Sequence, residues 1–127
     1  MSTAGRLSGV RVLVVDDDVD IRAAMALALR ADGAITDEVG DGSAAMHQLQ
    51  LSPPDALVLD LMLPGQSGFS VLERWRASAP SAPVVMVTAN RGRRHEELAR
   101  SLGADAYLVK PVPLSTLVEA VAQAVGR

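Results

Sequence analysis

The sequence predicts an α/β protein: a five-stranded parallel sheet with helices on both faces, in a doubly wound (βα)5 three-layer sandwich. Two observations lead to this fold class. Between residues 10 and 125, short apolar runs alternate five times with segments whose apolar residues recur at helical spacing. The run Ala56–Leu63 is apolar except for Asp60, which is typical of a strand buried on both faces. Such an alternation implies right-handed crossovers and helices on both sides of a parallel sheet.

The first strand is predicted to end in an acidic cluster. Residues Val10–Val15 are apolar and mostly β-branched, as in a central strand, and they lead directly into Asp16–Asp18. A helix is expected next, because the following apolar residues recur at helical spacing. Asp18 or Asp20 can cap the first turn of this helix, and Gly33 suits the position just after its last turn.

The second strand and helix are predicted from weaker patterns. Ile35–Val39 fits a short strand near an edge of the sheet, because its three central residues are polar. The pair Asp41-Gly42 is expected to turn the chain, and Ser43 is expected to cap the helix that follows. Pro53-Pro54 prevents that helix from continuing.

The third strand is predicted to end at a carboxylate. The apolar run begins at Ala56 and Pro64-Gly65 stops it, so Asp60 lies at the carboxyl end of the strand. Ligands of open parallel sheets bind outside the carboxyl ends of strands, although an acid there can also simply cap a turn. The next helix is expected to direct its apolar residues, including Trp75, into the core.

Two more strand–helix pairs complete the pattern. The fourth strand is expected at Pro83–Ala89, followed by a more polar helix at Arg93–Leu102 that Gly103 closes. The fifth strand is expected at Ala106–Lys110. The last helix is predicted to begin with Pro113 in its first turn and to present one apolar face, formed by Leu114, Leu117, Val118, Val121 and Val125.

Length and composition fit one domain. The chain has 127 residues, of which 49% are hydrophobic, and this is enough to close a single core. We expect residues 10–127 to form that domain and residues 1–9 to be a flexible tail. The sequence contains no cysteine, which excludes disulfides and cysteine-ligated metals and fits a reducing compartment.

Charge and hydropathy lead to expectations about partners. The net charge is −3 with acidic and basic residues interspersed, so the basic footprint of a nucleic-acid-binding protein is missing. We therefore expect no direct nucleic acid binding. No apolar stretch approaches the roughly 18 residues of a membrane span, and the first residues lack the apolar core of a signal peptide. These features predict a cytoplasmic protein that makes no membrane contact.

Polar side chains stand at the ends of four predicted strands. Asp16 and Asp17 follow the first strand, Asp60 follows the third, and Thr88 and Lys110 end the fourth and fifth. Since parallel strands share one direction, these groups are expected at one edge of the sheet. Crowded carboxylates repel one another unless a cation neutralises them, and hard oxygen ligands favour Mg²⁺. A carboxylate in such a site can be a nucleophile toward phosphoryl groups, with a lysine and a hydroxyl balancing charge.

These motifs resemble those of the receiver domain of two-component response regulators. In chain order they are Val14–Asp18 with Arg22, Asp60–Gly68, Val87–Ala89 and Tyr107–Pro111. The resemblance covers about Val10 to Val125. It implies the sheet order 2-1-3-4-5 of flavodoxin-like and chemotaxis-receiver-like folds. It also implies that the Lys110-Pro111 peptide bond is cis.

The resemblance assigns roles to the acidic residues. Asp60 is expected to be the phosphoacceptor. Asp17 and Asp60 are expected to be direct carboxylate ligands of Mg²⁺, with Asp16 acting mainly through water and the main-chain oxygen of Met62 as a further ligand. Mn²⁺ is an acceptable substitute for Mg²⁺.

The resemblance also implies a switch. A histidine kinase or phosphotransfer protein would donate a phosphoryl group to Asp60, so the domain takes part in its own phosphorylation and dephosphorylation and is not an enzyme. Lys110 and Thr88 would hold the phosphoryl group, and Tyr107 would then turn inward. The surface of the fourth helix, fifth strand and fifth helix would change and control an effector protein or domain. A homodimer is a further candidate assembly.

Other polar residues are expected to be structural. Asp18 and Asp20 are assigned to the start of the first helix. The cluster Arg91, Arg93, Arg94 and His95 opens the fourth helix, where cations oppose the helix dipole. We interpret it as a solvated face, with a docking surface for a partner as the alternative. Neither His47 nor His95 has sequence neighbours that indicate a metal site.

Two competing interpretations remain open. The segment Asp16–Asp20 superficially offers the nucleophile and the acid of a haloacid-dehalogenase-like phosphatase. Such enzymes need a substrate-covering cap and further acidic ligands late in the chain, where only Glu119 follows Lys110. Turnover of phosphate esters discriminates such a phosphatase from a receiver, which should lack it. The other alternative is a pseudo-receiver, the same fold used as a constitutive interaction module, against which the complete set of site residues argues.

Overall fold

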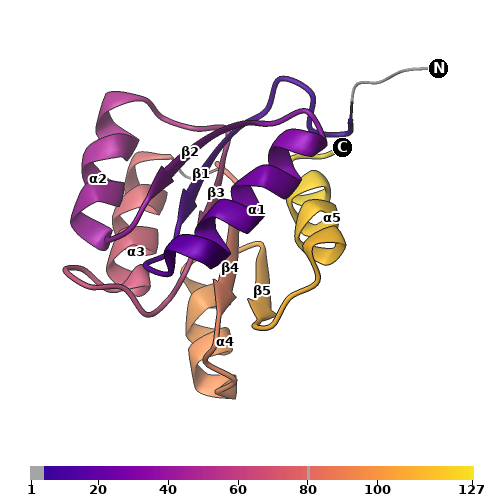
Figure 1. The fold of residues 1–127 in the computed structure, drawn as a ribbon. Coiled ribbons are helices and arrows are strands. Elements are labelled where there is room, and N and C mark those ends of the chain that lie inside the picture. The colour runs from indigo at the N-terminus through magenta and orange to yellow at the C-terminus, as the bar shows by residue number, and fades with distance from the viewer. Residues whose placement is uncertain (1–4, 80) are drawn as a thin grey trace.

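The computed structural model describes residues 5–79 and 81–127, and Figure 1 shows the fold. The strands are β1 (Arg11–Val15), β2 (Ile35–Val39), β3 (Ala56–Leu59), β4 (Val84–Thr88) and β5 (Ala106–Val109). The helices are α1 (Val19–Ala31), α2 (Gly42–Leu51), α3 (Gly68–Ser78), α4 (Arg93–Ser101) and α5 (Leu114–Ala124). All strand pairs are parallel and the order is β2-β1-β3-β4-β5, which confirms the predicted fold class and strand order.

The sheet separates two apolar cores. Because successive side chains of a strand point to opposite faces, alternate residues of the central strands enter different cores. Val12 and Val14 of β1 pack with α1 and α5 on one face, whereas Leu13 and Val15 pack with α2, α3 and α4 on the other. Every residue of β3 and β4 is buried, as predicted for central strands. Among the described residues, no helix is both long and apolar enough to cross a bilayer.

The ends of α1 agree with the expected capping residues. Asp18 is the N-cap, and its Oδ1 accepts hydrogen bonds from the N–H groups of Asp20 and Ile21, both at 3.0 Å. Gly33 follows the helix at φ +102°, a conformation that L side chains rarely adopt. A Cβ there would also lie 2.8 Å from the backbone of Ser8. Glycine is therefore required at this turn.

The predicted N-cap of α2 is wrong. Asp41, and not Ser43, is the N-cap: its Oδ1 accepts from the N–H of Ala44 at 2.7 Å, and the helix begins at Gly42. Gly42 is buried, and a Cβ on it would lie 2.2 Å from the main-chain oxygen of Gln66. The close approach of this loop therefore leaves no room for a side chain at position 42.

The end of the chain differs slightly from the predicted pattern. Pro113 is the N-cap of α5 and does not lie within its first turn. Leu117 and Val121 are buried as expected, but Leu114 is 42% exposed, because the first residue of the helix lies beyond the apolar core. The Lys110-Pro111 bond is cis, as the resemblance implies.

Residues 5–9 differ from the expected flexible tail. Leu7 is fully buried in the core that α1 and α5 cover. Its N–H donates to the main-chain oxygen of Asp32 at 3.0 Å, and the N–H of Gly9 donates to that of Gly33 at 3.2 Å. This segment therefore packs against the C-terminal end of α1. The rest of the expected tail, residues 1–4, lies outside the described residues.

The burial of Leu7 leads to a first prediction. Replacing a buried leucine by alanine leaves a cavity, so Leu7→Ala should lower the free energy of unfolding by about 3 kcal/mol. Leu27→Ala is the matched control, because Leu27 of α1 is 62% exposed and should lose little. Urea unfolding followed by circular dichroism measures both. Equal, small losses in the two variants would show that Leu7 does not contribute to the core.

Candidate functional site

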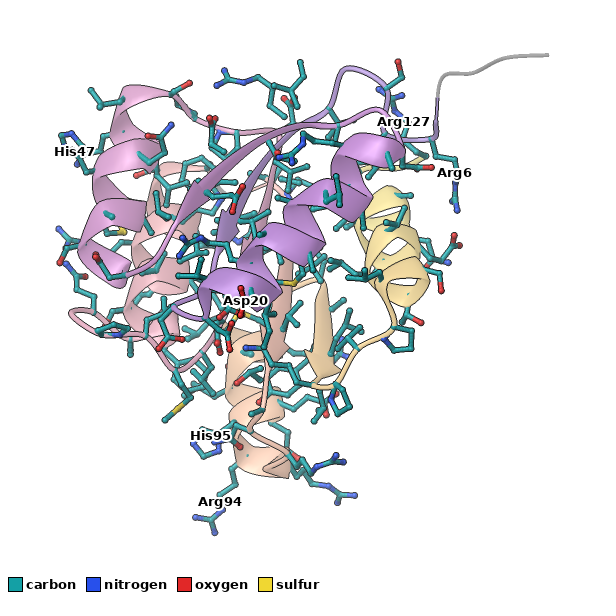
Figure 2. The ribbon with its side chains drawn as sticks, viewed as in Figure 1. Arg6, Asp20, His47, Arg94, His95 and Arg127 are labelled. Atoms are coloured by element: carbon teal, nitrogen blue, oxygen red, sulfur yellow. The ribbon has the colours of Figure 1, made fainter. Side chains whose placement is uncertain are left out.

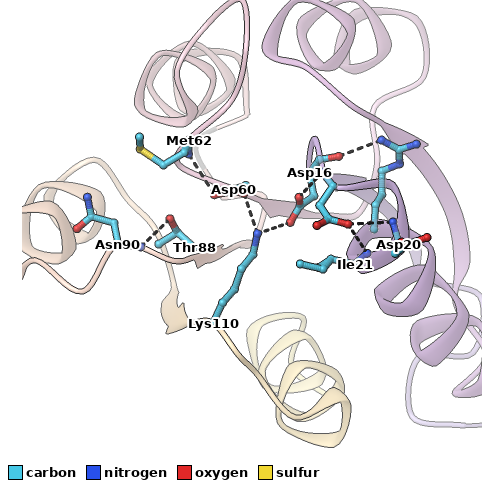
Figure 3. A network of polar contacts seen from close by, with 10 residues as sticks. Asp16, Asp20, Ile21, Asp60, Met62, Thr88, Asn90 and Lys110 are labelled. Atoms are coloured by element: carbon cyan, nitrogen blue, oxygen red, sulfur yellow. Dashed lines mark hydrogen bonds and ion pairs between the residues drawn. The ribbon is translucent and has the colours of Figure 1, made fainter.

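The predicted site residues meet at the carboxyl edge of the sheet. Asp16 and Asp60 directly follow β1 and β3, Thr88 is the last residue of β4, and Lys110 directly follows β5. Figure 3 shows Lys110 reaching between Asp60 and Asp16, with Thr88 close by. Four separate segments therefore contribute to one small region, because the parallel strands all end there.

Lys110 connects two carboxylates. Its Nζ lies 2.7 Å from Asp16 Oδ2 and 2.9 Å from Asp60 Oδ2, to which it donates a hydrogen bond. The lysine side chain is 16% exposed and both carboxylates are buried, so water screens these pairs only weakly. Lys110 is also the only lysine in the sequence, where all other cationic side chains are arginines or the two histidines.

The acidic residues form one compact group. Asp16, Asp17 and Asp60 each offer a carboxylate oxygen, and these oxygens lie within 4.8 Å of one another. Within residues 5–79 and 81–127, this is the group of acids and histidines that could hold a metal ion. Asp16 and Asp60 are buried, whereas Asp17 is exposed. One ammonium cannot balance three carboxylates, so this set of hard oxygen donors fits a divalent cation such as Mg²⁺.

Main-chain groups fix the orientation of the two buried acids. The N–H of Asp18 donates to Asp16 Oδ1 at 2.9 Å, and the N–H of Met62 donates to Asp60 Oδ1 at 3.1 Å. In each acid the other oxygen, Oδ2, faces Lys110. The side chain of Met62 is exposed beside the site.

Burial and ion pairing shift the pKa values of Asp16 and Lys110. Burial raises the pKa of Asp16 above its ordinary value, although the Lys110 ammonium and the N–H of Asp18 lower it in part. For Lys110, burial acts to lower the pKa, but the contacts with Asp16 and Asp60 outweigh it and raise the pKa above its usual value. Lys110 is therefore an ammonium at neutral pH.

Thr88 and Tyr107 both form hydrogen bonds with the main chain of Asn90. The N–H of Asn90 donates to Thr88 Oγ1 at 3.3 Å, and the hydroxyl of Tyr107 donates to the main-chain oxygen of Asn90 at 2.8 Å. Burial, followed by the charges of Glu96 and Asp60, raises the pKa of Tyr107, so its hydroxyl keeps the proton that it donates. Tyr107 is only 7% exposed, so the inward position expected after phosphorylation is already occupied in this structure.

Sequence reasoning missed the part that Asn90 plays. Its main chain bridges Thr88 and Tyr107, and its side-chain Oδ1 accepts from the N–H of Gly92 at 2.8 Å, just before α4. Main-chain hydrogen bonds are not encoded in residue type, so no sequence pattern marks this position. The spacing of two residues after Thr88 is its only visible feature.

The residues expected to be structural lie outside the acidic group. Asp18 caps α1, and its Oδ1 accepts two main-chain hydrogen bonds there. Figure 2 shows Asp20 at the start of α1, His47 on the outer side of α2, and Arg94 pointing away from the body of the molecule. The ring of His95 stacks on that of Phe69, with centroids 6.0 Å apart and planes at 7°. This contact joins α3 to α4.

The chain is similar to curated bacterial regulators. It is 45% identical over 114 residues to the transcriptional regulatory protein TcrA of Mycobacterium tuberculosis, a match that covers 89% of this chain and 45% of TcrA. It is 39% identical over 111 residues to the DNA-binding response regulator MtrA of Mycobacterium leprae, a match that covers 87% of this chain and 49% of MtrA. The chain therefore spans about half the length of these relatives.

The expectation of no direct nucleic acid binding is contradicted by the names of these relatives. MtrA is named a DNA-binding response regulator, and TcrA is named a transcriptional regulatory protein. The net charge of −3 describes only the 127 residues of this chain. It carries no information about a basic surface in the half of the relatives that the match does not cover.

Solved receiver structures have the same fold. The CheY-like response regulator receiver domain protein from Methanospirillum hungatei superposes with a TM-score of 0.89 at 25% identity, covering 93% of this chain and 94% of that chain. The receiver domain of Francisella response regulator 1452 superposes with a TM-score of 0.86 at 27% identity, covering 92% and 97%.

A family model covers nearly the whole sheet. The response regulator receiver domain model matches residues 12–122, which begin in β1 and end in α5. The match therefore includes the complete acidic group, Thr88 and Lys110. With the similarity to named response regulators and to CheY-like structures, it shows that this chain belongs to the response regulator receiver domains of two-component signalling systems.

Proposed function

We propose that the chain is a phosphorylation-dependent switch whose phosphoacceptor is Asp60. The observation that carries this proposal is the contact of one ammonium, Lys110, with the buried carboxylates of Asp16 and Asp60. A carboxylate so placed can act as a nucleophile, while the adjacent cation stabilises negative charge that arrives with a phosphoryl group. The remaining requirement is a phosphoryl donor.

A histidine kinase or a histidine phosphotransfer protein would supply the phosphoryl group. An oxygen of Asp60 forms the new P–O bond while the P–N bond of the phosphoimidazole breaks, and the imidazole leaves with the bonding electron pair. Lys110 keeps its proton, because its contacts raise its pKa, and it pairs with an oxygen of the transferred group. We place this exchange in the cytoplasm.

The acidic group supports Mg²⁺ as the cofactor of this transfer. Asp17 and Asp60 would hold the ion directly, Asp16 mainly through water, and the main-chain oxygen of Met62 would be a further ligand. Mn²⁺ would substitute. When bound, the ion neutralises charge on the phosphoryl oxygens during transfer.

Thr88 and Tyr107 would convert the new charge into a change of shape. The hydroxyl of Thr88 accepts from the N–H of Asn90, and a phosphoryl oxygen near Asp60 offers this hydroxyl a charged acceptor. If Thr88 turns toward that oxygen, Asn90 loses its bond, and the acceptor of Tyr107 moves with it. We propose that phosphorylation stabilises one arrangement of this group and thereby the surface of α4, β5 and α5.

The change of surface would act on an effector or on a second receiver. The names of TcrA and MtrA support the regulation of a DNA-binding effector, and the surface of α4, β5 and α5 would contact that effector or a second receiver. We propose the receiver as a phosphoacceptor that takes part in its own phosphorylation and dephosphorylation, without turnover of other phosphate esters.

Asp60→Asn tests the phosphoacceptor. Phosphoramidate contains the same P–N bond as phosphohistidine, so with Mg²⁺ it should add one acid-labile phosphoryl group to the unaltered chain, detected by intact mass. The variant should gain no phosphoryl group, because an amide is a poor nucleophile. It should keep its fold. Asp20→Asn is the matched control and should be phosphorylated normally. Label on Asp60→Asn would refute the assignment, and turnover of p-nitrophenyl phosphate would favour a phosphatase.

Asp17→Asn tests the metal site. Mg²⁺ should stabilise the metal-free chain, by about 2.7 kcal/mol when its concentration is 100 times the dissociation constant. Because Asp17 is exposed, its replacement should leave the fold intact and weaken Mg²⁺ binding about tenfold or more, as expected when a charged ligand is lost. Thermal unfolding at increasing Mg²⁺ measures this effect. The same midpoint shift in Asp17→Asn as in Asp20→Asn would exclude Asp17 as a ligand.

Lys110→Met tests the charge balance without metal. Removing one partner of a buried pair costs about 3 kcal/mol at pH 7. The raised pKa of Asp16 means that its stabilising contribution is complete below its ordinary value of 3.8 and is lost as pH rises through the folded pKa. Without Lys110 this folded pKa rises further, so Asp16 is protonated at higher pH. The loss should therefore be smaller at pH 4.5 than at pH 7.

Urea unfolding in a chelator measures this difference. Lys110→Arg keeps the cation and should lose less stability than Lys110→Met at pH 7. A loss in Lys110→Met that is equal at the two pH values would contradict the electrostatic account and leave only a packing effect.

A further inference from the structure

Arg22 of α1 reaches the edge of the sheet where the acidic group lies, but it contacts the main chain there and not a carboxylate of that group. Its Nη1 donates to the main-chain oxygen of Asp16 at 3.0 Å. Most of the arginine side chain is buried, so this bond is largely protected from competing water. The bond holds the peptide that joins Asp16 to Asp17, the two acids that follow β1.

A second contact of the guanidinium is an ion pair without a hydrogen bond. Its Nε lies 3.4 Å from Oε1 of Glu38 in β2. Glu38 also lies near Arg30, whose Nη1 is 3.8 Å from Oε2 of the same carboxylate. Arg30 donates its hydrogen bond to Thr36 at 2.9 Å and not to the acidic edge. Arg22 and Arg30 therefore share an anchor, but the bond to Asp16 is given by Arg22.

Gly40 leaves room for this arrangement. A Cβ on Gly40 would lie 2.8 Å from Nη1 of Arg22 and 4.0 Å from the main-chain oxygen of Asp16. The first distance is shorter than real Cβ contacts and the second is ordinary. A side chain at position 40 would thus displace the guanidinium before it disturbed the carbonyl that Arg22 holds.

The main chain of Asp16 and its Oδ1 make hydrogen bonds, whereas its Oδ2 is paired with Lys110. Its N–H donates to the main-chain oxygen of Val39 at 3.2 Å, its own oxygen accepts from Arg22, and its Oδ1 accepts from the N–H of Asp18. Without Arg22, the peptide after Asp16 would lose its fixed acceptor bond. The directions of the Asp16 and Asp17 carboxylates would then be less well defined.

We propose that Arg22 is a positioning residue for the metal site: by holding the main-chain oxygen of Asp16, it keeps the Asp16 and Asp17 carboxylates directed toward Asp60. This inference rests on the proposed Mg²⁺ site. Hydrogen bonds that orient metal ligands typically change metal affinity 10–100-fold. The effect of charge has the opposite sign, because removing a cation near the site should tighten the binding of another cation.

Calorimetric titration with MgCl₂ tests the proposal in four proteins: the unaltered chain, Arg22→Met, Arg30→Met and Gly40→Ala. The dissociation constant should rise about tenfold in Arg22→Met and in Gly40→Ala. Arg30→Met removes the same charge from the same glutamate and should stay within about twofold of the unaltered chain. Gly40→Ala keeps the arginine, so it decides the question if Arg22→Met does not fold.

Amide exchange of the metal-free proteins gives an independent readout. The N–H of Asp18, which donates to Asp16, should exchange faster in Arg22→Met and Gly40→Ala than in Arg30→Met. Unchanged or tighter Mg²⁺ binding in Arg22→Met, or an equal loss in Arg30→Met, would overturn the role of Arg22 alone. A failure of the unaltered chain to bind Mg²⁺ would instead overturn the proposed metal site, and the role of Arg22 with it.

Discussion

The site depends on one constraint, the crowding of three carboxylates of which two share one ammonium. A parallel sheet ends all its strands at the same edge, so Asp16, Asp60 and Lys110 meet there although they are far apart in sequence. Two of the acids are buried, where an uncompensated charge is costly. Lys110 offsets part of that cost and leaves an excess of negative charge. The proposed Mg²⁺ site depends on this excess of negative charge.

The sequence was sufficient to predict the features that follow from the alternation of strands and helices and from the shared direction of parallel strands. Five apolar runs separated by helical segments predict a doubly wound sheet, and polar residues at the ends of those runs then predict one shared edge. The observed contacts of Lys110 with Asp16 and Asp60 agree with this geometry. The strand order came from resemblance alone, because periodicity shows which segments are strands but not which strands are neighbours.

The remaining features depend on contacts that residue types do not reveal. Leu7 precedes any periodic segment, so only the packed structure shows that it enters the core. Asp41 and Ser43 are both good helix caps, and only the structure shows that Asp41 caps α2. Asn90 acts through its main chain, which is the same in every residue. Local sequence therefore predicts the elements and chemistry better than the contacts between loops.

The position of Asn90 indicates which helix can respond to the site. Its side chain accepts from Gly92, the N-cap of α4, so displacement of Asn90 reaches the start of that helix directly. Helix α4 buries only Ala99 among its nine residues, whereas α5 buries three residues. An element with few buried contacts shifts at a lower free-energy cost than one anchored in the core. The helix connected to Thr88 and Tyr107 is thus also the one that the core holds least.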